Sequence, residues 1–339
     1  MKKYTLLLLS MVFFTVACDN TDNEAVYVDT RIEGPAYLNV PNERTLLDPT
    51  PFLSQFWIVE SLGEFPANYR TSSDAFIDMS ETTLPPVFDI QYIPSREGLD
   101  DLKMSGSGEF TETSFYSLMD KIHENHSGRI VMLDLRSESH GYLNDTPVYL
   151  YGERNWCNLG MGHEEIPAYE RDTLNALVGQ TVYMHTTAKD SSLWTVSAAM
   201  TEDELCGVGG AEYKRIPALD YCFPSDDVIE EFVRYVNNLP TDVWLHFHCK
   251  QGKGRTTQFM AFYDMMKNPN VSLKDIVYRQ YLIGGLFLFD DGSNETKDWK
   301  REFLVEKSTL VPVFYEYVQA NWRNNFDISF SEWKKKTYK

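Results

Sequence analysis

A nine-residue segment constrains the fold of this chain more than any other feature. Residues 248–256 read His-Cys-Lys-Gln-Gly-Lys-Gly-Arg-Thr. The apolar run from Val243 to Phe247 predicts a buried strand before this segment, and Thr256 to Met266 predicts a helix rich in Phe and Met after it. A tight loop between such a strand and helix points backbone N–H groups and the positive end of the helix dipole into one cup. A cup of this kind suits a tetrahedral oxyanion.

The side chains of the loop suit phosphoryl transfer. We expect Cys249 at the base of the cup, where the same field favours the nucleophilic thiolate. Gly252 and Gly254 let the backbone turn without side chains that would block the anion. Arg255 can bind two phosphate oxygens with its planar fork and stabilise the charge that spreads over them in the transition state.

Three other interpretations of the segment are weaker. Cys249 could be a buried structural cysteine beside a solvated arginine. A metal site could use His246, His248 and Cys249, but no fourth ligand has suitable spacing. The segment also lacks the G-x-x-x-x-G-K-[ST] order of a nucleotide-binding loop. A nucleophilic cysteine remains the favoured interpretation.

Transfer of phosphate to a thiolate needs an acid for the leaving oxygen. Residues 213–224 place Asp220 in a loop between a short strand and a helix that begins near Ser225. Asp226 and Asp227 compete for the role, but their position suits helix capping and the helix dipole. We therefore predict that Asp220 is the general acid, because a loop residue can reach the cup.

Composition sets wider limits on the function. An aromatic content of 14% is too high for a disordered chain, and 339 residues suggest two domains or one large domain. The chain has 31 Lys and Arg residues but 50 Asp and Glu residues, and the resulting net charge of -19 disfavours nucleic-acid binding. The five cysteines have no repeated spacing, so they predict neither a disulfide framework nor a zinc ribbon. Whether Cys157, Cys206 and Cys222 pair stays open.

The first eighteen residues predict export. Lys2 and Lys3 precede an apolar run from Leu6 to Val16 that is too short to span a membrane, and Ala17-Cys18 follows it. This resembles a bacterial lipoprotein signal, in which the cysteine is lipidated and becomes the new N-terminus. Because Thr15 stands where that signal prefers leucine, cleavage without lipidation stays open. We expect a periplasmic or outer-surface protein with a lipid anchor on Cys18.

Apolar spacing elsewhere predicts strands that alternate with helices, which indicates a parallel α/β sheet. The further predicted elements are a helix from near Ser114, a strand from Ile130 to Leu133, a helix around Val228 to Val236, a helix from Ser272 to Gly284-Gly285, and a last helix over about 296 to 320 that Pro312 interrupts. Residues 141–212 differ, because short β-rich runs surround one helical piece near 165–178. They indicate a smaller inserted β unit.

Three segments together resemble the bacterial PTP-like phytases, which are cysteine-dependent myo-inositol phosphate phosphatases. They are Leu133 to Asn144, the loop from Ile216 to Asp220, and residues 248–256. Residues 151–156 and 279–285 are also similar to segments of that family, and the likeness runs from about Asn68 to about Tyr317. The resemblance implies an α/β fold with a protein-tyrosine-phosphatase-like parallel or mixed sheet, flanking helices and a smaller inserted partial β-barrel. It implies no metal and no organic cofactor.

The resemblance also implies roles for single residues. Cys249 would be the nucleophile, Arg255 the phosphate clamp and Asp220 the general acid, while Thr256 would assist the sulfur or the attacking water and His248 would have an orienting role. The residues expected to bind substrate or its phosphates are Lys250, Gln251, Gly252, Lys253, Gly254, Arg70, Lys189, Lys300, Arg301 and Lys307. For Glu138 and His140 we expect a structural role where the barrel meets the core.

The expected organisation follows from these observations. It comprises a signal peptide over 1–18, a linker and irregular segment over 19–66, the first part of a phosphatase core over 67–140, the inserted β-rich domain over 141–212, the second part of the core over 213–325 and a tail over 326–339. The predicted function is hydrolysis of myo-inositol polyphosphates through a phosphocysteine. Two alternatives stay open, namely a protein-tyrosine or phosphoinositide phosphatase and a non-catalytic phosphate-binding module. The expected partners are an inositol polyphosphate and, through the lipid anchor, a membrane.

Overall fold

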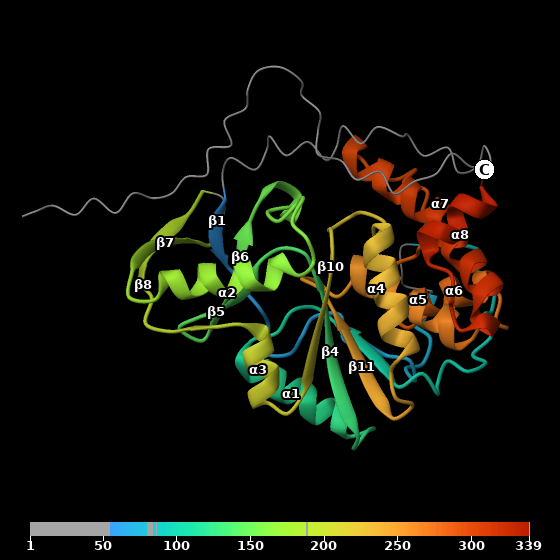
Figure 1. Cartoon of the computed structure of the whole chain (residues 1–339), viewed down its shortest axis with the longest axis horizontal. Coiled ribbons are helices and arrows are strands. Elements are labelled where there is room, and N and C mark those ends of the chain that lie inside the picture. The colour runs from blue at the N-terminus through green and yellow to red at the C-terminus, as the bar shows by residue number, and fades with distance from the viewer. Residues whose placement is uncertain (1–54, 80–83, 86, 188, 339) are drawn as a thin grey trace, which may run out of the picture.

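Two β-sheets organise the chain (Figure 1). The computed structural model describes residues 55–338 apart from 80–83, 86 and 188. The larger sheet has the strand order β10-β4-β11-β3-β2. Its strands are β2 (Arg70–Thr71), β3 (Met104–Ser107), β4 (Arg129–Arg136), β10 (Glu212–Ala218) and β11 (Val243–His248). Neighbours pair in parallel except at one edge, where the short β2 runs antiparallel to β3.

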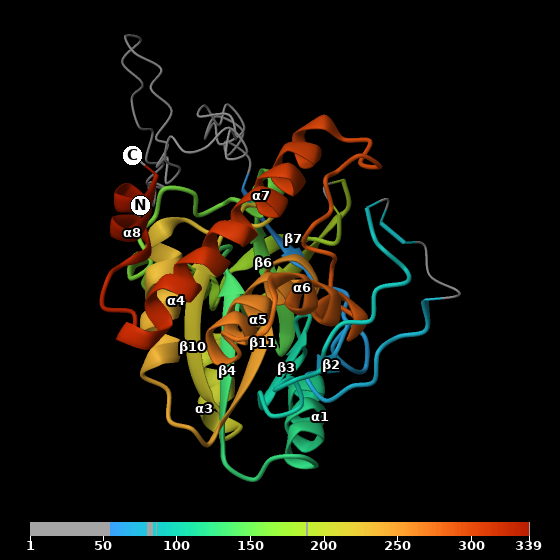
Figure 2. The ribbon, with the colours of Figure 1, turned by 90° about the vertical axis from the view of Figure 1, so that its right-hand side faces the viewer.

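Helices cover both faces of the larger sheet, because the central strands carry apolar residues on each side. Leu133 of β4 and Phe247 of β11 belong to the main core, whereas Met132 and Trp244 belong to a second core on the opposite face. The main core includes residues of α4 (Asp226–Asn237), α5 (Gly254–Lys267), α6 (Leu273–Leu282), α7 (Asp298–Asn321) and α8 (Phe330–Thr337). The second core includes residues of α1 (Glu112–His123) and α3 (Glu202–Val208). Figure 2 shows α5, α6 and α7 together on the first of these faces.

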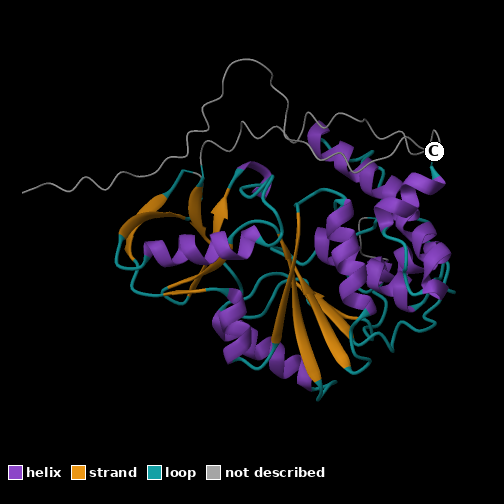
Figure 3. Ribbon diagram, viewed as in Figure 1, coloured by secondary structure: helices purple, strands orange, loops and turns teal. Residues whose placement is uncertain are grey.

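The smaller sheet lies beside the larger one and has the strand order β8-β7-β1-β6-β5-β9. Its strands are β1 (Phe56–Val59), β5 (His140–Leu143), β6 (Thr146–Tyr151), β7 (Thr181–His185), β8 (Ser191–Thr195) and β9 (Ala199–Met200). The helix α2 (Glu165–Leu177) runs across it (Figure 3). Leu174 of α2 packs in one apolar cluster with Trp57, Leu150 and Met184 from three of the strands.

The carboxyl ends of the parallel strands meet at one edge of the larger sheet. In an open α/β sheet this edge is where a ligand usually binds, because the loops that follow the strands converge there. The residues that follow β4, β10 and β11 are Ser137, Leu219 and Cys249. The topology therefore brings the acid loop and the cysteine loop, which are distant in sequence, to the same place.

The predicted fold class is confirmed, since a mixed α/β sheet with flanking helices and a smaller β unit is present. The predicted helix near 165–178 corresponds to α2, and the helix expected from Ser272 corresponds to α6, whose N-cap is Ser272. The Ser272 side chain accepts a hydrogen bond from the backbone N–H of Asp275 and so caps this helix. The domain boundaries stay a prediction.

Three segments differ from the expectation. Phe56–Val59 falls in the range predicted to be irregular, yet it forms β1, which pairs with β6 far along the chain. Pro312 does not interrupt the last long helix, because its neighbours Val311 and Val313 are buried in the core and their packing offsets the roughly 3 kcal/mol cost of a proline inside a helix. The predicted tail contains α8, which buries Phe330 and Trp333 in the main core.

Within the described residues, none of the helices has both the length and the apolar character that a bilayer span requires. The predicted signal peptide and Cys18 lie outside the described residues. The export and anchoring predictions therefore stay predictions.

Candidate active site

Cys249 lies directly after β11 and is buried, with 3% of its surface exposed. The Oγ1 of Thr256, in the first turn of α5, donates a hydrogen bond to the Cys249 Sγ at 3.2 Å. A donor at this distance stabilises a thiolate more than a thiol, because the interaction with the charged form is stronger. The strand and the helix thus hold the nucleophile and its hydrogen-bond donor in one fixed geometry.

The loop after Cys249 has its carbonyl groups bound on the side away from the site. The carbonyl of Lys250 accepts from the Glu109 N–H at 3.2 Å, and that of Gln251 accepts from Asn68 Nδ2 at 2.8 Å. The carbonyl of Gly252 accepts from Arg70 at 2.6 Å. In a trans peptide the N–H points opposite to the carbonyl. The N–H groups that follow these three carbonyls therefore point the other way, as the oxyanion cup requires.

A residue larger than glycine does not fit at position 252. Its φ is +70°, and a Cβ there would lie 2.3 Å from the N of Gly108 and 2.3 Å from the carbonyl carbon of Ser107. The prediction that Gly252 lets the backbone turn is confirmed. At Gly254 a Cβ would meet only the Lys307 Nζ at 3.8 Å, so this glycine leaves room at the cavity instead of relieving a backbone clash.

Arg255 extends from the first turn of α5 and is held by Glu138. Its Nη1 and Nη2 donate to the two oxygens of Glu138 at 2.7 and 2.9 Å. Its Nε is buried and finds no hydrogen-bond acceptor among the described residues. Burial opposes the charge, but the carboxylates of Asp220 and Glu138 raise the pKa of Arg255 above its ordinary value. A charged, pre-oriented donor is therefore available to a phosphate.

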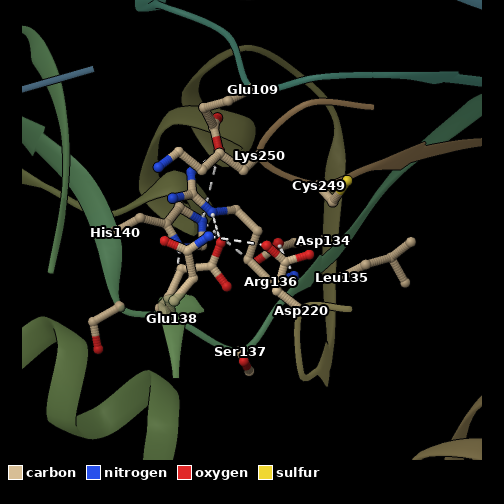
Figure 4. Close-up of polar contacts among 12 residues, drawn as sticks. Glu109, Asp134, Leu135, Arg136, Ser137, Glu138, His140, Asp220, Cys249 and Lys250 are labelled. Carbon is tan, nitrogen blue, oxygen red and sulfur yellow. Dashed lines mark hydrogen bonds and ion pairs between the residues drawn. The ribbon is translucent and has the colours of Figure 1, made fainter. Parts of the chain in front are cut away.

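Glu138 also connects this clamp to a larger buried cluster (Figure 4). Arg136 donates to Glu138 at 3.0 Å and to Glu109 at 2.6 Å. Although burial opposes ionisation, Arg255 and Arg136 hold the pKa of Glu138 at about 2. The sequence prediction of a structural role is incomplete, because Glu138 binds the very arginine that is expected to bind phosphate.

Asp220 lies half-buried across from Arg255, with its Oδ1 3.5 Å from the Arg255 Nε. Its Oδ2 accepts a hydrogen bond from Asn155 Nδ2 at 2.9 Å, and its main-chain carbonyl accepts from the Trp156 indole N–H at 2.9 Å. The rival Asp226 has its carboxylate 2.6 Å from the Nζ of Lys334. Asp227 lies 3.0 Å from the Nε2 of His163. The structure thus brings Asp220, and neither rival, next to the cysteine loop.

One cavity of about 510 Å³ joins these groups. Cys249, Arg255 and Asp220 line it together with the backbone and side chains of the loop. Four lysines also line it, namely Lys250, Lys253, Lys300 and Lys307. The remaining walls include Tyr149, Tyr151, Asn155, Tyr221, Leu286, Phe303 and Leu304. The site is therefore a cationic cavity whose base is a cysteine.

The lysines differ in their surroundings. Lys307 is 9% exposed and makes no ion pair within the described part of the chain, and burial lowers its pKa. Burial also lowers the pKa of Lys250 to about 8, against the attraction of Glu60, whose carboxylate lies 3.8 Å away. Lys300 pairs with Glu295 at 2.8 Å, whereas Lys253 is exposed at the start of α5.

Three residues predicted to contact substrate lie elsewhere. Arg70 is 1% exposed and does not line the cavity, because its guanidinium binds the loop from behind. Lys189 is exposed between β7 and β8, also away from the cavity lining. Arg301 pairs with Asp298 at 3.0 Å and donates to the carbonyl of Gly292 at 3.2 Å. The geometry does not support a substrate contact by any of them.

His248 is fully buried and does not line the cavity. Its Nε2 is 2.8 Å from Glu202 of α3, and although burial opposes the charge, this carboxylate raises the pKa of His248 to about 9. His140 also contacts Glu202, at 3.1 Å. Both histidines therefore belong to a buried polar cluster beneath the site, which fits the structural role expected of His140.

None of the four cysteines in the described residues forms a disulfide, and all four are buried. Burial raises the pKa of Cys157 to about 12 and raises that of Cys206 well above its ordinary value. These two are inert as thiols near neutral pH. The open question of their pairing is thus answered for Cys157, Cys206 and Cys222.

Sequence reasoning missed the residues that the smaller sheet contributes. Tyr149 and Tyr151 of β6 and Asn155 just after it line the cavity. A signal was present, because residues 151–156 belong to the segments that resemble the family. Nothing in the local pattern, however, says that an inserted unit folds back to the site.

A family model for PTP-like phytases, which carries the description "inositol hexakisphosphate", matches residues 133–267. The structure of a PTP-like myo-inositol phosphatase from Mitsuokella multacida, solved in complex with myo-inositol-(1,3,4,5)-tetrakisphosphate, is 36% identical with a TM-score of 0.77. That match covers 83% of this chain and 49% of the other. A PTP-like phytase from Bdellovibrio bacteriovorus is 28% identical with a TM-score of 0.66, over 90% of this chain and 99% of its own. The family model and both solved structures agree that this chain is similar to the PTP-like phytases.

A further relative is the effector protein hopD2 of Pseudomonas syringae pv. tomato, which is 26% identical over 250 residues. The match covers 70% of this chain and 53% of hopD2. The chain thus spans about half the length of hopD2 and of the Mitsuokella phosphatase, and nearly the full length of the Bdellovibrio phytase. The two solved structures show that the described residues adopt the PTP-like phytase fold.

Proposed function

We propose that this protein hydrolyses phosphomonoesters of myo-inositol polyphosphates through a phosphocysteine intermediate. The observation that carries the proposal is the single cavity that Cys249, Arg255 and Asp220 line together with four lysines. A nucleophile, a phosphate clamp and an acid in one cavity provide the groups for phosphoryl transfer to sulfur. The lysines add positive charge beyond what one phosphate needs.

In the first step the Cys249 thiolate attacks phosphorus and the bond from phosphorus to the ester oxygen breaks. Asp220 gives its proton to that oxygen, so the inositol leaves as an alcohol and Asp220 becomes a carboxylate. The Arg255 Nε, which finds no acceptor among the described residues, donates to the transferring phosphoryl group. The N–H groups of the loop after Cys249 stabilise the remaining oxygens.

In the second step water attacks the phosphocysteine. Asp220, now a carboxylate, takes a proton from this water, and the phosphorus–sulfur bond breaks. Thr256 donates its hydrogen bond to the departing sulfur, which leaves as the thiolate. Inorganic phosphate departs and both Cys249 and Asp220 are restored to their starting states.

The lysines favour a substrate with several phosphates. Lys307 is a buried cation that makes no ion pair within the described chain, and it faces the cavity. A phosphate beyond the reacting one can pair with such a group through charge-assisted hydrogen bonds of roughly 1.5–3 kcal/mol each. The Mitsuokella relative solved with an inositol tetrakisphosphate supports the same substrate class. A single phosphotyrosine would leave these cations unused.

The test is phosphate release from a panel of substrates. We expect kcat/KM to be higher for inositol hexakisphosphate than for a phosphotyrosine peptide or a phosphoinositide, and we expect Cys249→Ser to release none. A preference for the phosphotyrosine peptide would refute the substrate class but keep the chemistry. If the wild-type protein releases phosphate from none of the three, the non-catalytic binding module is the better account.

We also propose that the protein is exported and anchored through a lipid on Cys18. Support comes from the two lysines, the short apolar run and Ala17-Cys18 at the start of the chain. One acyl chain binds membranes only marginally, so stable retention needs more than one. Mass spectrometry of the native protein tests the proposal, since an unmodified N-terminus downstream of Cys18 would contradict it.

A further inference from the structure

We propose that Asn155, which reaches the site from the smaller sheet, positions Asp220 for proton transfer; the inference rests on the proposed function. The residue follows β6 in a short 3-10 turn over Glu153–Asn155 and is half-buried at the cavity wall. Its role would be to hold a carboxyl group that itself touches the leaving oxygen.

The contacts around Asp220 assign a separate partner to each oxygen. Asn155 Nδ2 donates to Oδ2 at 2.9 Å. Oδ1 accepts the N–H of Tyr221 at 3.1 Å and lies 3.5 Å from the Arg255 Nε. The neighbouring Trp156, 1% exposed, holds the main chain of Asp220 through its indole N–H. Two consecutive residues of one turn therefore hold the acid by its side chain and by its backbone.

Arg255 attracts the Asp220 carboxylate, and the hydrogen bond from Asn155 opposes this attraction. Without Asn155, the attraction by Arg255 would be unopposed by that hydrogen bond. The guanidinium would draw the carboxyl toward the phosphate clamp, where it would neutralise Arg255 instead of protonating the leaving oxygen. An amide donor opposes this movement without adding a charge. Asn155 is thus suited to keep Asp220 and Arg255 in separate roles.

The backbone around this hydrogen bond is strained on both sides. Arg154, Asn155 and Tyr221 have φ values of +59°, +64° and +70°, in the left-handed region that costs a residue such as Arg or Tyr about 1 kcal/mol or more. The Arg154 guanidinium lies 5.2 Å from the Trp156 ring and 4.9 Å from the ring of Trp299 in α7. Strain that surrounding packing maintains is typical of a functional turn.

Apolar packing holds the residues that follow Asp220 in the acid loop, because Cys222 clusters with Trp156 and Phe303, and Phe223 belongs to the main core. A second cavity, of about 290 Å³, is lined by Leu219, Cys222 and Phe223 of the loop. Asp220 and Tyr221, which lie between Leu219 and Cys222 in the sequence, line the catalytic cavity instead. Packing thus holds the loop, whereas the direction of the Asp220 carboxylate, which faces the cavity, depends on hydrogen bonds such as that of Asn155.

The test compares two leaving groups. Asn155→Gly keeps the positive φ without strain and removes the amide. We expect kcat for inositol hexakisphosphate, whose leaving group is an alcohol, to fall about tenfold or more, because acid catalysis contributes roughly 10²–10⁴. With para-nitrophenyl phosphate, whose leaving group needs little protonation, we expect less than about a twofold loss. KM should change little for either substrate.

A double substitution and two further variants complete the test. In an Asp220→Asn background, Asn155→Gly should cause no further loss, since the group that it positions is already disabled. Asn155→Asp, which keeps the shape but replaces the donor with a second carboxylate, should reproduce the loss. Asn158→Ala is the matched control, because Asn158 donates to Ser137 and Ser139 in the same segment and does not touch Asp220. Its effect should be equal on both substrates.

The inference is overturned if Asn155→Gly affects both substrates equally, has no effect, or adds its full loss to that of Asp220→Asn. These outcomes are separate from a failure of the proposed function. If Asp220→Asn itself does not discriminate between the two leaving groups, the acid assignment fails. A clear Asp220 effect without an Asn155 effect refutes only the positioning role.

Discussion

Replacing Arg70 by methionine removes the guanidinium that supports the cysteine loop while it keeps a side chain of similar length. Arg70 donates to the carbonyl of Gly252 at 2.6 Å, to that of Asn68 at 3.0 Å and to the Oγ1 of Thr257 at 3.1 Å. The side chain is buried behind the loop. The substitution therefore tests whether the loop must be held from this side.

The magnitude follows from the hydrogen bond to Gly252. A hydrogen bond to a charged group contributes roughly 1.5–3 kcal/mol, and its loss leaves a buried carbonyl without a partner. The peptide that joins Gly252 to Lys253 is then free to rotate, and its N–H no longer points into the cup. Loss of one such donor typically lowers kcat by about 10²–10³. We expect a loss of about a hundredfold for every phosphate ester.

The assay measures kcat and KM for inositol hexakisphosphate and for para-nitrophenyl phosphate, with the thermal unfolding midpoint as a check on folding. Both substrates should lose kcat by similar factors, because the cup binds the phosphate that they share. Lys189→Met is the control, since this exposed cation does not line the cavity and should leave both substrates unaffected. A rise in KM for hexakisphosphate alone would refute the reasoning and restore Arg70 as a contact to an outer phosphate.

Three further predictions concern single charges. Lys307→Met should raise KM for hexakisphosphate several-fold and spare para-nitrophenyl phosphate; equal effects on both would contradict an outer-phosphate role. Because burial lowers the pKa of Lys250 to about 8, its charge is present below pH 8, so kcat/KM for hexakisphosphate should fall as the pH rises through 8. Lys250→Arg keeps its charge above pH 8, so its kcat/KM should not fall there. Identical pH profiles for the wild type and Lys250→Arg would contradict this role of Lys250. The depressed pKa of Glu138, about 2 against an ordinary 4.5, means that its carboxylate stabilises the fold above pH 4.5 and that this contribution is lost as the pH falls toward 2. Glu138→Gln should lower the free energy of unfolding by about 3–5 kcal/mol near neutral pH, and denaturant titrations should find this difference shrinking in acid.

The central α/β fold could be predicted because its signals are local. The apolar run of β11, the glycine loop and the apolar helix α5 are consecutive in sequence, and each follows from residue periodicity. The cysteine, the arginine and the acid follow from the same local segments. Phosphoryl transfer needs a nucleophile, a cation and an acid, and this need restricts which residue types can occupy these positions.

The remaining features depend on contacts between distant residues. The strand β1 forms because Phe56–Val59 pairs with residues 148–151, and no local pattern specifies that partner. Arg70 carries the same charge as a substrate-binding arginine, and only its burial behind Gly252 distinguishes the two roles. The helix α8 was not predicted, because three consecutive lysines follow Trp333, although Phe330 and Trp333 face the core. Burial and long-range pairing decided each of these cases.

The most direct test of the account is to trap the covalent intermediate. Wild-type protein and the Asp220→Asn variant are mixed with inositol hexakisphosphate, quenched in acid within the first turnover, digested and mapped by mass spectrometry. The account predicts one phosphorylated residue, Cys249, and none in Cys249→Ser. Phosphate on any other residue, or turnover without a phosphorylated Cys249, would contradict it.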